Sequence, residues 1–163
     1  MKQDKEHTVF DVAKWFAGRK KNGLRMKKLQ KLCYYAQAWS LALYDKPLFK
    51  GKFRAWVHGP VNKKLWKEFQ DISYRKITVS DFKDPERDLK FQSLQKEEKE
   101  FLRRVWATYG QYSGSELEIL THRERPWLEQ RTGLNPFENS DRVISPESMR
   151  DFYRGLYIQG DDA

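Results

Sequence analysis

The chain has very little cysteine: Cys33 is the only one among its 163 residues. One cysteine cannot form an internal disulfide or a multi-cysteine metal site, and its place in an apolar helical pattern predicts a small buried core residue. No stretch approaches the roughly 18 consecutive apolar residues of a membrane span, and residues 1–7 are polar, unlike a secretory signal. We therefore expect a cytoplasmic protein that has no disulfide framework and no contact with a membrane.

Sequence motifs of known catalytic chemistry are lacking as well. The chain has no glycine-rich phosphate loop, no HExxH pattern and no Gly-x-Ser-x-Gly turn. Its only histidines are His7, His58 and His122. A pair of His58 and His122 with a carboxylate such as Glu124 is one conceivable acid–base or metal site, but histidines at the ends of elements more often satisfy backbone groups. We expect no enzymatic activity, no cofactor and no metal.

The composition is that of a folded protein with one basic half. Hydrophobic residues make up 39% and charged residues 34%, and 6 Trp, 8 Tyr and 10 Phe are too many aromatics for a disordered chain. Residues 1–76 hold 19 Lys and Arg against 6 Asp and Glu, and residues 77–163 hold 13 against 17. The charge of +13 followed by −4 predicts a basic surface for an acidic partner, which is either nucleic acid or an acidic protein.

Hydrophobic spacing predicts a mainly α fold. Apolar residues recur at helical spacing, and capping-box patterns stand at Thr8 with Asp11 and at Ser113 with Glu116. The helix after Asn22-Gly23 is apolar nearly all round beyond Leu32, which predicts a central helix surrounded by protein. We expect six to seven helices, near residues 8–17, 24–44, 60–71, 94–109, 113–122, from 126 and from 145.

The connecting segments are predicted from the glycine and proline residues that interrupt the helical patterns. Residues 47–57 indicate a short extended segment or a hairpin around Gly51, and Pro60 is well placed as the first residue of the third helix. Residues 75–92 indicate a loop with short strand character at 77–79. With 163 residues we expect a single compact helical domain over residues 1–163, with a core at about 8–158 and frayed termini.

Positive charge is densest around the start of the second helix. Arg19-Lys20-Lys21 precedes Arg25, Lys27, Lys28 and Lys31, and the third helix adds Lys63, Lys64 and Lys67. Nucleic-acid binding would place these cations on phosphates, with Tyr34 or Trp66 for stacking. No helix-turn-helix or zinc-finger pattern accompanies them, so a protein-facing or solvated surface is favoured.

Several short motifs together resemble one family. Residues 28–39 (KLQKLCYYAQAW) are followed by Lys-Pro-Leu-Phe at 46–49, Ala-Trp-Val-His-Gly-Pro-Val at 55–61, Leu-Thr-His at 120–122 and Pro-Trp at 126–127. This order resembles the Panacea domain of SocA-like antitoxins and phage-associated proteins, and the resemblance spans roughly residues 10–157. The chain departs from the family pattern at Cys33, where an aliphatic residue is usual, and at Arg123-Glu124-Arg125, which is more charged than usual.

The resemblance implies a compact helical domain that neutralises a toxin encoded beside it. Toxins paired with the family are unrelated to one another and include small alarmone-synthetase-like enzymes that modify tRNA. One family member is an adaptor that delivers its toxin to a protease. Stoichiometric protein binding without turnover is therefore the expected function, and a nucleic-acid-binding regulator or a proteolytic adaptor is the alternative.

Two placements of the toxin-binding surface remain open. The first uses the basic start of the second helix, the third helix and an aromatic anchor: Arg25, Lys27, Lys28, Lys31, Lys63, Lys64, Lys67 and Trp127. The second uses the family-motif residues Trp56, His58, Gly59, Pro60, Thr121, His122 and Pro126. The second set is equally explained by structure, with Gly59 supplying backbone freedom and Pro60 starting a helix.

Overall fold

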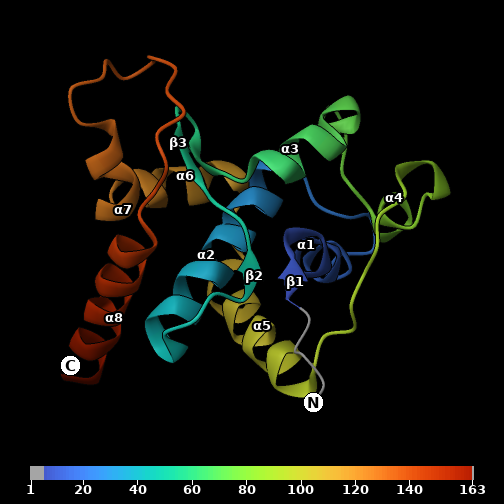
Figure 1. Ribbon diagram of the computed structural model, residues 1–163, viewed down its shortest axis with the longest axis horizontal. Helices are drawn as coiled ribbons and strands as arrows, with labels where there is room; N and C mark the ends of the chain where they lie inside the picture. Colours follow the sequence, from blue (N-terminus) through green and yellow to red (C-terminus); the bar gives the residue numbers. More distant parts are fainter. Residues whose placement is uncertain (1–5, 163) are drawn as a thin grey trace.

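The computed structural model describes residues 6–162, and helix α2 (Met26–Tyr44) runs through its middle (Figure 1). This helix contacts α1, α3, α5, α6, α8 and strand β4. Its apolar side chains from Leu29 to Ala38 are buried on every face, because other elements surround it. The prediction of a central helix is confirmed.

The architecture is mainly α and compact, as predicted. The other α-helices are α1 (Val9–Ala17), α3 (Lys63–Phe69), α4 (Val79–Phe82), α5 (Lys96–Tyr109), α6 (Gly114–His122), α7 (Arg125–Leu128) and α8 (Pro146–Asp162). Single 3-10 turns span Gln70–Ile72, Pro85–Arg87 and Glu129–Arg131. None of the helices within residues 6–162 is both long and apolar enough to span a membrane.

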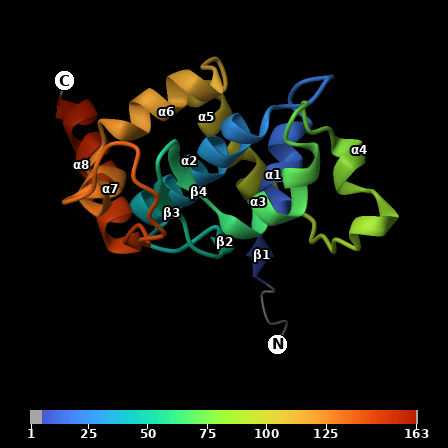
Figure 2. The ribbon, with the colours of Figure 1, turned by 90° about the horizontal axis from the view of Figure 1, so that it is seen from above.

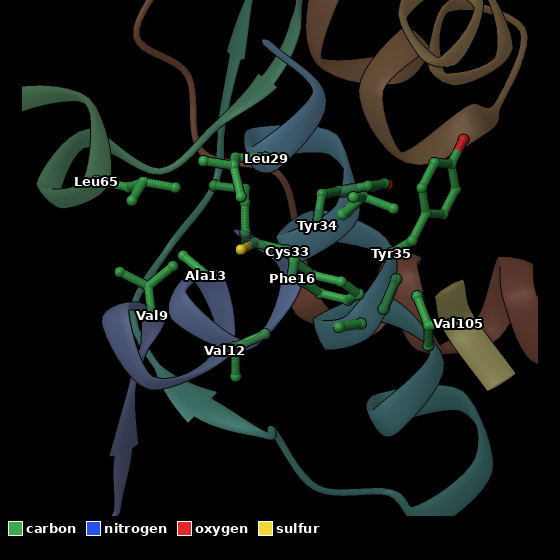
Figure 3. Packing of buried hydrophobic residues seen from close by; sticks show 14 of the residues in the cluster. Val9, Val12, Ala13, Phe16, Leu29, Cys33, Tyr34, Tyr35, Leu65 and Val105 are labelled. Carbon is green, nitrogen blue, oxygen red and sulfur yellow. The ribbon is translucent and has the colours of Figure 1, made fainter. Parts of the chain in front are cut away.

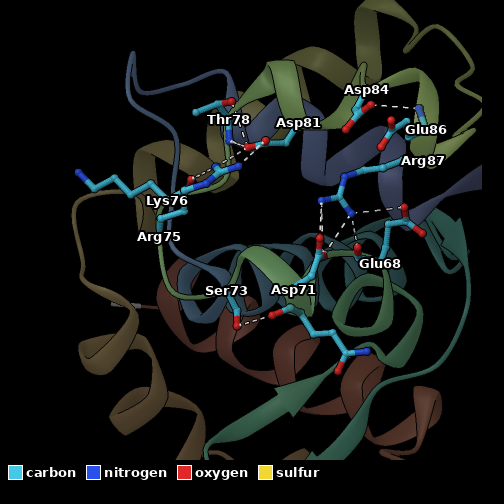
Figure 4. Close-up of polar contacts among 11 residues, drawn as sticks. Glu68, Asp71, Ser73, Arg75, Lys76, Thr78, Asp81, Asp84, Glu86 and Arg87 are labelled. Atoms are coloured by element: carbon cyan, nitrogen blue, oxygen red, sulfur yellow. Dashed lines mark hydrogen bonds and ion pairs between the residues drawn. The ribbon is translucent and has the colours of Figure 1, made fainter.

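Helix α4 is the one helix that the sequence pattern did not predict. It lies in the segment read as a loop, and the side chains of Thr78 and Asp81 form a capping box at its start. The strand character expected at 77–79 is limited to Ile77, whose backbone forms an isolated bridge with Leu24. The Asp81 carboxylate also accepts hydrogen bonds from Arg75, and Arg87 reaches back to Glu68 and Asp71 (Figure 4). These contacts hold the polar segment against the helices.

The predicted helix caps are present. The capping boxes at Thr8 and Ser113 are both formed. Ser145 caps α8, where its hydroxyl oxygen accepts the backbone N–H of Ser148 at 3.1 Å and Pro146 is the first helical residue. Local side chains therefore set three helix starts, as the sequence indicated.

The extended segment forms two small sheets, but the predicted hairpin is displaced. Strand β1 (His7–Thr8) pairs in parallel with β2 (Phe49–Lys50), and β3 (Arg54–Trp56) pairs antiparallel with β4 (Gly59–Val61). The hairpin therefore turns at Val57 and His58, and the expectation of a turn at Gly51 is wrong.

Pro60 lies within β4, so the expectation that it starts the third helix is also wrong. Asn62 decides where α3 begins, because its side-chain oxygen caps the helix by accepting the N–H of Leu65 at 3.1 Å. Asn62 is itself held by Gln30, which accepts the Asn62 N–H at 2.8 Å and donates to the Asn62 carbonyl at 3.0 Å. This buried pair joins α2 to the end of the hairpin.

The apolar core surrounds α2 and includes the face on which α1 packs. Val9, Val12 and Phe16 of α1 are buried in one cluster with Leu29 and Cys33 of α2, and Figure 3 shows part of this cluster. Cys33 is fully buried, and burial raises the pKa of its thiol above the ordinary range. The prediction of a core cysteine is confirmed.

A buried polar cluster lies on the other side of α2. The hydroxyls of Tyr35 and Tyr153 donate to the same Glu124 carboxylate oxygen, at 2.6 and 2.9 Å, and the hydroxyl of Tyr34 lies 3.0 Å from that of Tyr153. Burial raises the pKa of Glu124 to about 6, although both tyrosines favour its charged form. Glu124 is therefore a link between α2, α7 and α8, and its partners are tyrosines, so the alternative in which it pairs with His58 and His122 is wrong.

Candidate partner-binding site

The motifs at residues 28–39, 55–61 and 120–122 meet at one point, Gly59. Its φ is +106°, and a Cβ at this position would lie 2.6 Å from Cε of Lys31 and 3.0 Å from the hydroxyl oxygen of Thr121. Thr121 is buried and donates to the carbonyl of Glu118 at 2.8 Å. Gly59 is thus required both for its backbone conformation and for the close approach of two other segments.

Lys31 is not part of an exposed basic face, which corrects the sequence-based expectation. The residue is 1% exposed, and its ammonium donates to the Pro60 carbonyl at 3.4 Å under the hairpin. Burial lowers the pKa of Lys31 to about 7, opposed by the charge of Glu118 and assisted by that of Lys27. The helical pattern placed Lys31 away from the Leu29 and Leu32 stripe, but the β3–β4 hairpin covers that face.

The other cations predicted for the toxin-binding surface differ in whether they have an ion-pair or hydrogen-bond partner within the chain. Lys27 forms an ion pair with Glu118 at 2.9 Å, and Lys28 donates to the carbonyl of Gly110 at 2.6 Å. Lys63 pairs with Asp141 at 3.0 Å, and Arg25 donates to the carbonyl of Tyr74 at 2.9 Å. The exposed side chains of the set are those of Arg25, Lys64 and Lys67.

His58 and His122 lie on one pocket, together with Glu118. The Nδ1 atom of His58 is 3.3 Å from the Glu118 carboxylate, which Lys27 also contacts. Burial opposes ionisation of Glu118, but these two partners together lower its pKa. The imidazole of His122 is half-buried, and burial lowers its pKa.

Trp127 lines this pocket but is buried, so little of its side chain is open to a partner. Its ring stacks on that of His122 with centroids 4.0 Å apart and planes at 11°. Its indole N–H donates to the carbonyl of Trp56 at 2.8 Å, which attaches α7 to the hairpin. Pro126 is buried beside it in the first turn of α7.

The pocket has a volume of about 470 Å³ and an apolar rim. Its lining comes from the hairpin turn, from α6 and α7 and from the loop that follows them: Val57, His58, Glu118, His122, Trp127, Leu128, Arg131 and residues 134–137. Two apolar side chains stand out into solvent: Phe137 is 86% exposed and Leu128 is 50% exposed. We call the surface formed by this lining the motif pocket.

Arg131 and Asp141 anchor the loop that carries Phe137. Arg131 is buried and donates to the carbonyls of Ala55 at 3.0 Å and Glu138 at 2.6 Å. Asp141 accepts the indole N–H of Trp56 at 3.0 Å and contacts Lys63. The loop that carries the exposed Phe137 is therefore held at both ends by contacts with the rest of the domain.

Sequence reasoning missed the residues from 128 to 137 that complete the pocket. Phe137 follows the turn-forming pair Asn135-Pro136, and no periodicity marks a loop side chain as functional. Glu118 carried a usable signal, because it stands four residues before His122 on a predicted helix and so shares its face.

The lining offers little support for catalysis. The residues around the pocket include no serine, threonine, cysteine or lysine to act as a nucleophile beside His58 or His122. Among the residues that the structure describes, no group of three or more His, Cys, Asp or Glu side chains is placed to hold a metal ion. The geometry is that of a partly polar pocket with an apolar, solvent-facing edge.

Comparison with protein families identifies the family of this chain. Residues 29–128 match the model described as the antitoxin SocA-like, Panacea domain. The chain belongs to this antitoxin family. Comparison with curated proteins and with solved structures found no significant match. The matched region of the Panacea domain includes Lys31, Gly59, Thr121 and Trp127, whereas the loop with Phe137 and helix α8 lie beyond it.

Proposed function

We propose that this protein is a cytoplasmic, single-domain antitoxin that neutralises a toxin encoded beside it by direct, non-catalytic binding at the motif pocket. The observation that carries the proposal is the exposed Phe137, held on an anchored loop beside Leu128 at the edge of a pocket built from family-motif residues. Residues 29–128 match an antitoxin family, which makes a toxin the expected partner in general.

Physical chemistry favours this surface over the basic one as the main contact. A large aromatic side chain on an anchored loop contributes binding energy at a low cost in conformational entropy. An exposed apolar edge beside a pocket is typical of a protein-binding surface. Lys27 and Lys63 are already paired with carboxylates within the chain, so less of their charge is available to a toxin.

The remaining exposed cations have a second role in the proposal. Arg25, Lys64 and Lys67 attract an acidic toxin over distance, which mainly raises the association rate and weakens with salt. This role fits the excess of positive charge in residues 1–76.

The experiment is co-expression of this protein with the product of the adjacent gene, followed by growth scoring and co-purification. We expect growth to be rescued and a stable complex to be recovered. A Phe137→Ser variant should lose both, because it removes the apolar anchor without disturbing the core. Tyr74→Ser is the matched control, since Tyr74 is also a strongly exposed aromatic (75%) but lies outside the motif pocket.

Four results would contradict the proposal. A harmless neighbouring gene product would remove the antitoxin function itself. Rescue without any complex would favour an adaptor that directs the toxin to a protease. Equal behaviour of Phe137→Ser and Tyr74→Ser would show that the contact surface lies elsewhere, and binding to operator DNA or tRNA at physiological salt would favour the nucleic-acid-binding alternative.

A further inference from the structure

A second pocket, also of about 470 Å³, lies at the start of α2 and is lined by five cations and no carboxylate. The cations are Lys20, Lys21, Arg25, Lys28 and Lys76. None of them takes part in an ion pair within the described part of the chain. We call this feature the basic pocket; its lining shares no residue with the motif pocket.

Segments far apart in the sequence bring these cations together. Lys20 and Lys21 lie in the loop between α1 and α2, Arg25 is the N-cap residue of α2, Lys28 lies in its first turn, and Lys76 lies just before α4. Figure 2 shows the ribbon of these elements from above. The Leu24–Ile77 bridge holds the loop and the Lys76 segment side by side. The side chain of Lys76 extends away from the neighbouring ion pairs (Figure 4).

The fold leaves this positive charge largely uncompensated. Burial lowers the pKa of Lys28, the charge of Lys20 lowers it further, and only Glu116 opposes them. Glu116 is occupied at the cap of α6, where its carboxylate accepts the N–H of Ser113 at 2.9 Å. Glu118, the next carboxylate on α6, forms an ion pair with Lys27, which does not line the basic pocket.

Two helix N-termini add to the positive potential. Gly114, the first residue of α6, packs so closely on α2 that a Cβ there would lie 3.1 Å from the backbone nitrogen of Lys28. The first turn of α2 has no acidic residue and no side-chain cap, although an acidic residue there would be favourable. Cations placed against a helix dipole are locally unfavourable, and a bound anion would relieve this cost.

We infer that the basic pocket is a binding site for phosphate groups. A phosphate presents several oxygens at once, which suits convergent ammonium and guanidinium donors and the N–H groups of a helix start. The volume is in the range of small-molecule sites, so a compact phosphorylated ligand is accommodated. The inference does not rest on toxin binding at the motif pocket, because the two pockets share no lining residue and bind by different chemistry.

Nuclear magnetic resonance of the ¹⁵N-labelled full-length protein tests this inference, with inorganic pyrophosphate as the probe at about 0.15 M salt. The backbone amides of Gly23 and Gly114, which both line the pocket, should shift with saturation. A Lys20→Gln/Lys76→Gln variant should weaken binding by about tenfold or more, because two charge-assisted contacts are lost. Both lysines are exposed, so this variant should remain folded.

The matched control is Lys50→Gln/Lys52→Gln, which removes the same charge from two exposed positions outside the basic pocket. It should bind pyrophosphate as the unmodified protein does. Equal weakening in both double variants, or no saturable shift of Gly23 and Gly114, would overturn the inference.

Two further probes identify the source of the phosphate. Tighter binding of a short single-stranded oligonucleotide, lost in Lys20→Gln/Lys76→Gln, would support the site and assign it to nucleic-acid phosphates. Binding of pyrophosphate but not of the oligonucleotide would support it and assign it to a small phosphorylated ligand. Equal affinity for an oligoglutamate peptide would overturn it, because the pocket would then select negative charge and not phosphate.

Discussion

Lys31 lies directly beneath Gly59, where a Cβ would come within 2.6 Å of the lysine Cε atom. The contact joins the central helix to the hairpin, and Thr121 closes the same point from α6. The Lys31 side chain belongs to the motif at residues 28–39, and the motifs at residues 55–61 and 120–122 enclose it. The motifs of the Panacea domain are, at this point, first of all a packing arrangement that builds the wall of the motif pocket.

Replacing Gly59 should therefore destabilise the fold strongly. Gly59→Ala forces a residue with a Cβ into φ +106° and against Lys31, so the free energy of unfolding should fall by about 3 kcal/mol. Gly133→Ala separates the two causes, because Gly133 also has a positive φ but meets nothing within 4 Å. Its cost should be about 1 kcal/mol in denaturant unfolding. Equal losses would remove the steric argument.

The buried Lys31 should make stability rise with pH between about 7 and about 9. Its pKa is about 7 in the folded protein against 10.5 in a solvated chain. In this window the unfolded chain holds the proton more tightly, so protonation favours unfolding. The free energy of unfolding should rise by on the order of 1 kcal/mol per pH unit. Above about pH 9 the rise should flatten, because burial raises the pKa of the Cys33 thiol, the unfolded chain loses that proton first, and this contribution opposes that of Lys31.

The comparison that isolates Lys31 is the pH dependence of Lys31→Met. Methionine has a similar length but no titrating group, so the slope between pH 7 and 9 should flatten. His7 titrates in both proteins; burial lowers its pKa, but bonds to Asp11 and Glu98 outweigh this and raise it above 6.5, which opposes the Lys31 slope near neutrality. An unchanged slope in Lys31→Met would contradict the assignment.

Glu124 should be essential for stability through its oxygen atoms and not through its charge. Glu124→Ala leaves the buried hydroxyls of Tyr35 and Tyr153 without their acceptor and should cost about 3 kcal/mol. Glu124→Gln keeps an acceptor oxygen and should cost about 1 kcal/mol.

The pH profile provides a second readout for Glu124. The carboxyl pKa is raised from 4.5 to about 6 in the folded protein, so this group makes stability fall as pH rises through that interval. Glu124→Gln should lack this fall when unfolding is followed by circular dichroism. A fall of the same size in the variant would assign it to another group.

Arg131 should control the order of the loop that presents Phe137. Arg131→Met removes the hydrogen bonds to Ala55 and Glu138, so amide hydrogen exchange in residues 132–141 should accelerate. Toxin affinity should fall with it, because a mobile anchor must be ordered on binding. Arg123→Met is the control, since Arg123 is exposed nearby and outside the pocket lining. Unchanged exchange in Arg131→Met would mean that other contacts hold the loop.

Most of the helical architecture was predictable, because its signals are local. Capping boxes at Thr8 and Ser113 and the Ser145-Pro146 start lie within a few residues of the helices that they begin. The all-round apolar pattern of α2 indicated its central position. The third helix was placed too early because its cap, Asn62, is held by Gln30, which lies 32 residues away in the sequence.

The binding surfaces were predictable only in part, because exposure is a property of the assembled chain. The basic residues at the start of α2 form a cluster in the sequence, yet Lys31 is buried while Lys28 lines the basic pocket. Lys76 joins that pocket only through the pairing of Leu24 with Ile77. Trp127, predicted as an aromatic anchor, is buried, and the exposed aromatic at the motif pocket is the loop residue Phe137.

The sequence by itself determined the mainly α architecture, the central helix and the positive charge of residues 1–76, because periodicity, capping and composition act over short distances. It also carried the motif order that marks the antitoxin family. Only the tertiary structure decided which charged groups are buried, which are paired and which face solvent. Those properties depend on what packs above each side chain, and here the covering elements come from segments distant in the sequence.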